Sequence, residues 1–142
     1  MALACHGIER CFTAEGKKNQ AQNYINQGIE AITKAIQDAK DKDQTLRVRT
    51  FLRYAAILYS DRGDHAKGIA LAGEALAMTS PTEPSPYCLA LETKCQIMLR
   101  MAPGEEELRS FLDSIDTGAI ENAPEGIQRR VKELIKRLSP CN

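Results

Sequence analysis

Apolar side chains recur at steps of three and four residues along most of the chain, which is the spacing of helices with one buried face. The stripe is clearest between residues 21 and 39, and its members are Ala21, Ile25, Gly28, Ile32, Ala35 and Ala39. A second stretch, over residues 44–61, is more strongly apolar. No stretch alternates apolar and polar residues in the manner of a strand. The pattern therefore predicts a chain built from helices.

Glycines, prolines and polar clusters divide this pattern into seven predicted helices. Gly63 stands where a left-handed backbone would end a helix, and Asp64 can cap the next one. Ser85 before Pro86 is a similar start signal, and Asn122 begins a motif that resembles a capping box. The predicted helices span 2–14, 21–39, 44–61, 64–78, 86–101, 105–115 and 123–138, with a polar link at 116–118.

The composition also favours helices. The chain has 18 alanines and 13 leucines against two valines, and it has no tryptophan. Alanine and leucine are among the strongest helix formers, whereas valine favours strands. A chain of 142 residues has the length of one domain. We therefore expect an all-α fold in a single domain over residues 1–142.

Opposite charges balance over the whole chain, because 19 lysines and arginines stand against 19 aspartates and glutamates. This balance argues against a dedicated binder of nucleic acid or anionic membranes, whose surface is broadly basic. The last predicted helix is locally basic, at Arg129, Arg130, Lys132, Lys136 and Arg137. One apolar and one charged face are what the terminal cap of a helical stack requires, with binding to an acidic partner, a membrane surface or nucleic acid as the alternative for this helix. We expect no nucleic acid among the partners.

The cysteines do not predict a disulfide framework. Their number, five, is odd, and the first 11 residues lack the basic start and apolar run of a secretory leader. Cys88 and Cys95 lie two turns apart on one predicted helix, which is too far for a disulfide, so we expect two small core residues. The apolar runs are also far shorter than a membrane span. These observations predict a cytoplasmic protein without a membrane span.

A pattern of large and small residues extends from residue 50 to residue 81, over two predicted helices and their turn. The residues that carry it are Leu52, Ala55, Ala56, Tyr59, Gly63, Gly68, Ala75 and Leu76, followed by Pro81. This pattern resembles a tetratricopeptide repeat (TPR), in which small residues let paired helices approach closely and large ones fill the gaps between pairs. Where such repeats carry a large aromatic residue midway along the second helix, this chain has Ala72.

The resemblance implies an architecture of stacked antiparallel helical hairpins. The same glycine and alanine spacing, offset by 40 residues, indicates a degenerate repeat over 8–43. The helices over 86–116 supply a third pair on spacing alone, and the helix over 123–138 is the C-terminal cap. We therefore expect a short right-handed, TPR-like solenoid of about seven helices.

Few residues suggest chemistry of their own. Cys5, His6 and Cys11 lie close together, but a structural zinc site usually needs four ligands in paired spacing. Neither His6 nor His65 has a serine, cysteine or carboxylate at a spacing typical of nucleophilic catalysis. No phosphate-binding loop, zinc-protease motif or calcium loop is present. We expect no enzyme activity and no cofactor, with a small metal or thiol protein as a minor alternative.

The resemblance implies a protein-binding module or adaptor. The first helices of each pair would form a groove for a partner peptide or helix, with aliphatic contacts for affinity and arginine to orient an acidic group. The candidate groove residues are Arg49, Arg53, Ile57 and Lys94. A second hypothesis is a structural subunit that docks in a larger assembly or pairs with another copy of the chain.

Overall fold

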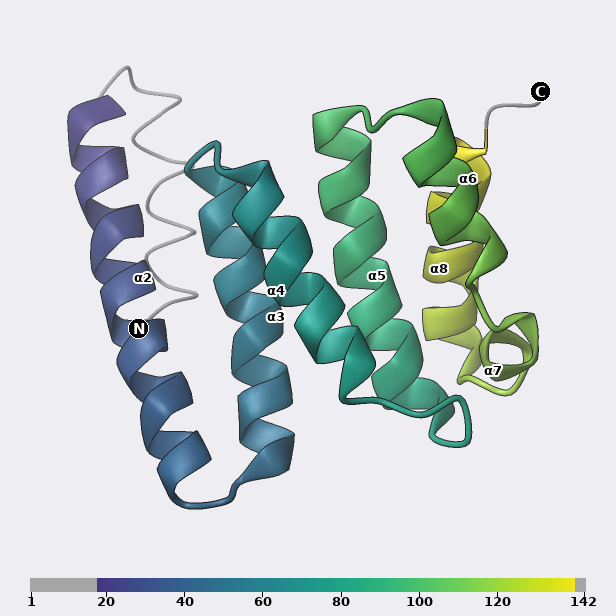
Figure 1. Cartoon of the computed structure of the whole chain (residues 1–142), viewed down its shortest axis with the longest axis horizontal. Coiled ribbons are helices and arrows are strands. Elements are labelled where there is room, and N and C mark those ends of the chain that lie inside the picture. Colours follow the sequence, from purple (N-terminus) through teal and green to yellow (C-terminus); the bar gives the residue numbers. More distant parts are fainter. Residues whose placement is uncertain (1–17, 140–142) are drawn as a thin grey trace. The chain divides into compact units, whose positions relative to one another are not determined.

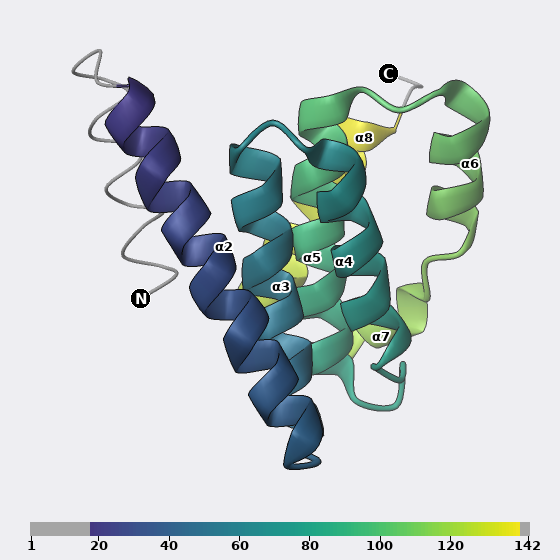
Figure 2. The ribbon, with the colours of Figure 1, turned by 60° about the vertical axis from the view of Figure 1, so that its left-hand side comes forward.

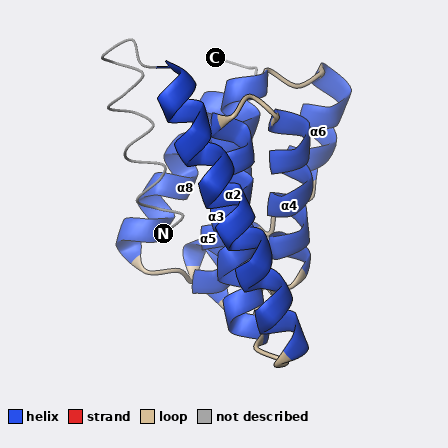
Figure 3. Ribbon diagram, turned by 90° about the vertical axis from the view of Figure 1, so that its left-hand side faces the viewer, coloured by secondary structure: helices blue, strands red, loops and turns tan. Residues whose placement is uncertain are grey.

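The computed structural model describes residues 18–139, which form seven helices and no strand (Figure 1, Figure 3). The helices are α2 (Lys18–Asp41), α3 (Thr45–Asp61), α4 (His65–Ala77), α5 (Pro84–Met101), α6 (Glu105–Asp113), α7 (Thr117–Glu121) and α8 (Glu125–Leu138). The predicted all-α fold is therefore confirmed over these residues. The helix predicted over 2–14, with Cys5, His6 and Cys11, lies outside them.

The chain divides into two compact units, unit 1 over Met1–Ala75 and unit 2 over Leu76–Asn142. Helices α2, α3 and nearly all of α4 belong to unit 1, and α5 to α8 belong to unit 2. The single domain and the right-handed stack of repeats stay predictions.

In unit 1 the long helix α2 packs along α3, and the two helices run in opposite directions (Figure 2). Their buried residues recur at three- and four-residue steps, so each helix presents an apolar stripe. These residues include Ala21, Ile25, Gly28, Ile29 and Ile32 of α2, and Val48, Leu52, Ala55, Ala56 and Leu58 of α3. Arg62 at the end of α3 donates a hydrogen bond of 3.2 Å to Asn26 of α2. That bond sets residue 62 level with residue 26.

The turn between α3 and α4 has the predicted geometry. Gly63 adopts a positive φ of 97°, which glycine tolerates and other residues rarely adopt. The Asp64 carboxylate accepts a hydrogen bond of 3.2 Å from the Lys67 amide, one of the free amides at the start of α4. The prediction for both residues is confirmed. The next helix therefore turns back along α3 within three residues.

Helix α4 buries small residues. Gly68, Ala72 and Ala75 are all buried, together with Leu71. Ala72 is 0% exposed, so its methyl group is enclosed at the position where the resemblance expects a large aromatic side chain.

Unit 2 is arranged around α5. Helix α8 packs along α5, and α7 packs against both. Residues on nearly every side of α5 are buried, as expected for a central helix. They are Tyr87, Cys88, Ala90, Leu91, Thr93, Cys95, Ile97 and Met98. The expectation that Cys88 and Cys95 are small core residues is confirmed, since both are buried free thiols.

The polar link predicted at 116–118 is wrong, because a short helix, α7, begins there. The Asp116 carboxylate accepts a hydrogen bond of 2.9 Å from the Ala119 amide and so caps the helix. The Asp116 amide in turn donates a hydrogen bond of 2.8 Å to the Tyr87 hydroxyl of α5. Burial of Ala119 and Ile120 then holds α7 in place although it has only five residues.

Two predicted helix starts are also wrong. Helix α5 begins at Pro84, two residues earlier than expected, with Glu83 rather than Ser85 at the N-cap. Proline fits the first turn because the amide it lacks would have no partner there. The expected capping box does not form, since Asn122 ends α7 and Pro124 stands at the N-cap of α8.

Two glycine substitutions are expected to change stability in opposite directions. Gly63→Ala should lower the free energy of unfolding by about 1 kcal/mol, because alanine is strained at positive φ. Gly126→Ala, in the first turn of α8 with open space around the added methyl group, should leave it unchanged or raise it by up to about 0.5 kcal/mol. Urea denaturation measures both. Equal losses for the two variants would contradict this account of the turn.

Tyr87→Phe is expected to lower the free energy of unfolding by about 1 kcal/mol, because the part-buried Asp116 amide loses its acceptor. Tyr54→Phe is the matched control, because no described residue hydrogen-bonds its hydroxyl, and it should change stability little. Thermal or urea denaturation compares the two. If the Tyr54 variant loses as much stability as the Tyr87 variant, the hydrogen bond is not the cause.

Candidate functional site

A groove on the surface of unit 1 is formed by three helices. It has a volume of about 470 Å³, which lies in the range of ligand-binding clefts, roughly 300–1,000 Å³. Helix α3 supplies its middle, and α2 and α4 supply its two walls. The lining residues are Thr33, Lys34, Ile36, Gln37 and Lys40 of α2, Leu52, Ala55 and Tyr59 of α3, and Lys67, Leu71 and Glu74 of α4. We call this feature the α3 groove.

The α3 groove has an apolar floor and a polar rim. Leu52, Ala55 and Leu71 are buried, and Ile36 and Tyr59 are half-buried. The other six lining residues are exposed and carry an amide, a hydroxyl, three ammonium groups and one carboxylate. Such a division resembles the core and rim of a protein interface, in which apolar area supplies affinity and polar groups supply orientation.

Tyr59 combines apolar area with a polar group at one end of the groove. The Arg62 guanidinium lies 4.9 Å and the Lys67 ammonium 5.9 Å from the centre of its ring, within range of cation–π attraction. Among residues 18–139, none hydrogen-bonds the Tyr59 hydroxyl. Tyrosine with a free hydroxyl is typical of binding surfaces, because it offers rigid apolar area and a hydrogen bond together.

The rim carries an excess of positive charge, since three lysines stand against Glu74. Lys34 pairs with Glu30 at 3.2 Å, but both side chains are more than two-thirds exposed, so the pair is weak. The Lys40 ammonium and the Glu74 carboxylate pair with no residue of the described part of the chain. These side chains can therefore turn toward a bound molecule at little cost.

None of the four candidate residues from the sequence lines the α3 groove. Arg49, Arg53 and Ile57 are half-buried and lie four residues apart along α3, so they share a stripe. At 100° per residue this stripe lies roughly a third of a turn away from the groove residues Leu52 and Ala55. Lys94 belongs to unit 2, where its ammonium lies 4.8 Å from the centre of the Phe111 ring.

The residues expected to pack the repeat have several environments. Leu52, Ala55, Ala56, Gly68 and Ala75 are buried, Tyr59 and Leu76 are half-buried, and Gly63 is exposed in the turn. Three of them, Leu52, Ala55 and Tyr59, line the groove. The expected packing residues therefore supply the floor of the candidate site.

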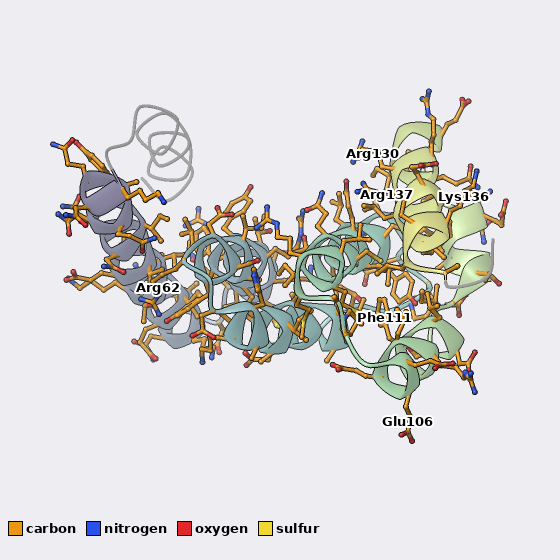
Figure 4. All side chains as sticks on the ribbon, turned by 90° about the horizontal axis from the view of Figure 1, so that it is seen from above. Arg62, Glu106, Phe111, Arg130, Lys136 and Arg137 are labelled. Atoms are coloured by element: carbon orange, nitrogen blue, oxygen red, sulfur yellow. The ribbon has the colours of Figure 1, made fainter. Side chains whose placement is uncertain are left out.

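The basic face of α8 is partly neutralised. Arg130 donates to Glu92 of α5 at 2.8 Å and 3.4 Å, and Lys132 pairs with Glu121 of α7 at 2.8 Å. Figure 4 shows Arg130, Lys136 and Arg137 around α8. Glu125 and Glu133 lie among these cations, so positive and negative groups share this face of α8.

A serine and a histidine are paired across the α3–α4 turn, which sequence spacing did not indicate. The Ser60 hydroxyl lies 2.8 Å from Nδ1 of His65. Ser60 is only 2% exposed, however, so a substrate cannot reach its oxygen. The pair joins the end of α3 to the first residue of α4. We assign it to the stability of the turn.

The two buried cysteines are poor nucleophiles. Burial raises the pKa of Cys95 to about 12, and the nearby Lys94 offsets only part of the rise. Burial also raises the pKa of Cys88, and the Glu92 carboxylate adds to the effect. Because the thiolate is the reactive form, both groups stay protonated and inert near neutral pH.

The comparisons give no relative: no family model, curated protein or solved structure matches the chain. Within residues 18–139, no three His, Cys, Asp or Glu residues are grouped as metal ligands would be. No helix in the same part of the chain is both long enough and apolar enough to cross a membrane.

Cys88 and Cys95 are expected to resist alkylation by iodoacetamide at pH 8 in the folded protein and to react once urea unfolds it. Their raised pKa values and their burial both suppress attack. Peptide mass spectrometry measures the labelling at each residue. Labelling of Cys95 at similar rates with and without urea would contradict the assignment.

Proposed function

We propose that this chain is a non-enzymatic protein-interaction module that binds a segment of a partner protein in the α3 groove. The observation that carries the proposal is the composition of the groove, with a buried apolar floor beneath an exposed polar rim. TPR-like adaptors act in this general way, and the resemblance of residues 50–81 to such a repeat supports the same class of function.

The apolar part of the affinity would come from the lining residues that still reach the surface. Ile36 is half-buried and presents apolar area that a partner side chain can cover, at roughly 25 cal/mol per Å² removed from water, whereas Leu52 and Leu71 are already buried beneath it. Tyr59 adds a ring and an available hydroxyl. Rim groups such as Gln37 would orient the partner and contribute less, as polar rims generally do.

The proposal uses a different surface from the one expected from the sequence. Arg49, Arg53 and Ile57 lie on a neighbouring stripe of α3, and Lys94 lies in unit 2. None of them lines a described cleft together with the others. The groove brings apolar and polar groups together in one described cleft, which supports its choice as the binding surface.

A photo-reactive amino acid at position 37 tests the proposal, with position 38 as the matched control. Gln37 lines the groove, whereas its exposed neighbour Asp38 does not. In cells that naturally contain the chain, position 37 should crosslink to another protein and position 38 should not. Mass spectrometry identifies the crosslinked segment.

Two outcomes would reject the proposal. Equal crosslinking at positions 37 and 38 would show that the groove is no preferred surface. Crosslinks from position 37 to further copies of the chain alone would favour the structural subunit. In that case sedimentation of the purified protein should show a concentration-dependent dimer.

A further inference from the structure

We infer that the segment bound in the α3 groove is an acidic amphipathic helix of about three turns. This inference rests on the proposed function and assigns the chemistry of the partner. It follows from the length of the groove, from the backbone of its walls and from the position of its lysines.

The groove has the length of a short helix. The Arg62–Asn26 hydrogen bond sets residue 62 of α3 level with residue 26 of the antiparallel α2. At a rise of about 1.5 Å per residue, Lys40 then lies roughly 21 Å along the axis from that level. Tyr59, with Lys67 beside its ring, lies only about 4.5 Å from it. Lys40 and Lys67 are therefore about 16 Å apart along the groove, which is three turns of helix.

The walls favour a helix over an extended peptide. Both walls and the middle of the groove are helices, whose backbone groups are paired within each helix, so these helices offer no open strand edge for β-addition. Recognition of proline-rich segments uses several aromatic residues, and Tyr59 is the one aromatic residue that residues 18–139 contribute to the lining. An amphipathic helix instead places side chains at steps of three and four residues on one line, which suits a straight apolar floor.

The positions of the lysines indicate the sign of the charge that the bound segment should carry. Lys40 marks one end of the groove and Lys67 the other, with Lys34 on the α2 wall between them. Among the described lining residues, Glu74 on the opposite wall is the one that is acidic. A bound helix with acidic residues near both ends would therefore make a favourable charge interaction with a lysine at each end. A basic helix would be repelled by the same lysines.

Synthetic helical peptides test the inference on the full chain. The probe is a fluorescein-labelled 14-residue peptide with leucine at positions 4, 8 and 11 and glutamate near both ends. A matched peptide carries lysine in place of each glutamate. Fluorescence anisotropy should show at least about tenfold tighter binding of the acidic peptide at low salt, and the difference should shrink as salt rises.

Charge reversal of the protein provides the decisive comparison. The double variant Lys40→Glu with Lys67→Glu should lose the acidic peptide and gain the basic one. The control Lys42→Glu alters an exposed lysine that pairs with Asp38 and does not line the groove, so it should leave the preference unchanged. Circular dichroism checks that each variant remains folded.

The outcomes separate the inference from the proposed function. NMR spectra of the protein with each peptide show which residues are contacted. If the basic peptide shifts the amide resonances of the groove residues as strongly as the acidic peptide does, the charge assignment is wrong. The groove then remains a docking site. If neither peptide shifts them, the inference is wrong. The proposed function is then decided by the crosslinks from position 37, which require no designed peptide.

Discussion

Unit 1 depends on how closely its helices can approach where alanine and glycine face a neighbour. Ala55 and Ala56 of α3, with Gly68 and Ala72 of α4, are all buried and carry little or no side chain. Helices that meet at such residues pack at the short end of the usual 8–10 Å separation. Ala55 also lines the groove, one turn of α3 from Leu52 and one turn from Tyr59.

Most helices could be predicted because their signals are local. The stripe of α2 and the turn at Gly63 depend on residues close together in the sequence. Helix α7 could not be predicted in this way. It is short, and it depends on a hydrogen bond from the Asp116 amide to Tyr87, which lies 29 residues away in the sequence.

The candidate site could be predicted only in part. The floor residues Leu52 and Tyr59 stand out in the sequence through their resemblance to a repeat. The rim residues Lys34 and Lys40 do not, because an exposed residue of α2 joins the groove only if α2 has a particular rotation against α3. That rotation is set by tertiary packing. Arg49 and Arg53 are the opposite case. They stand out in the sequence by their regular spacing, but they do not line the groove.

The single guanidinium of Arg62 has a consequence for how the groove and the helix pair affect each other. It hydrogen-bonds Asn26 of α2 and also lies over the ring of Tyr59. A molecule bound on Tyr59 would therefore lie beside the residue that bonds α3 to α2. By thermodynamic linkage, a ligand that favoured this arrangement would stabilise the α2–α3 pair, and a change that loosened α2 would lower the affinity for that ligand by the same free energy.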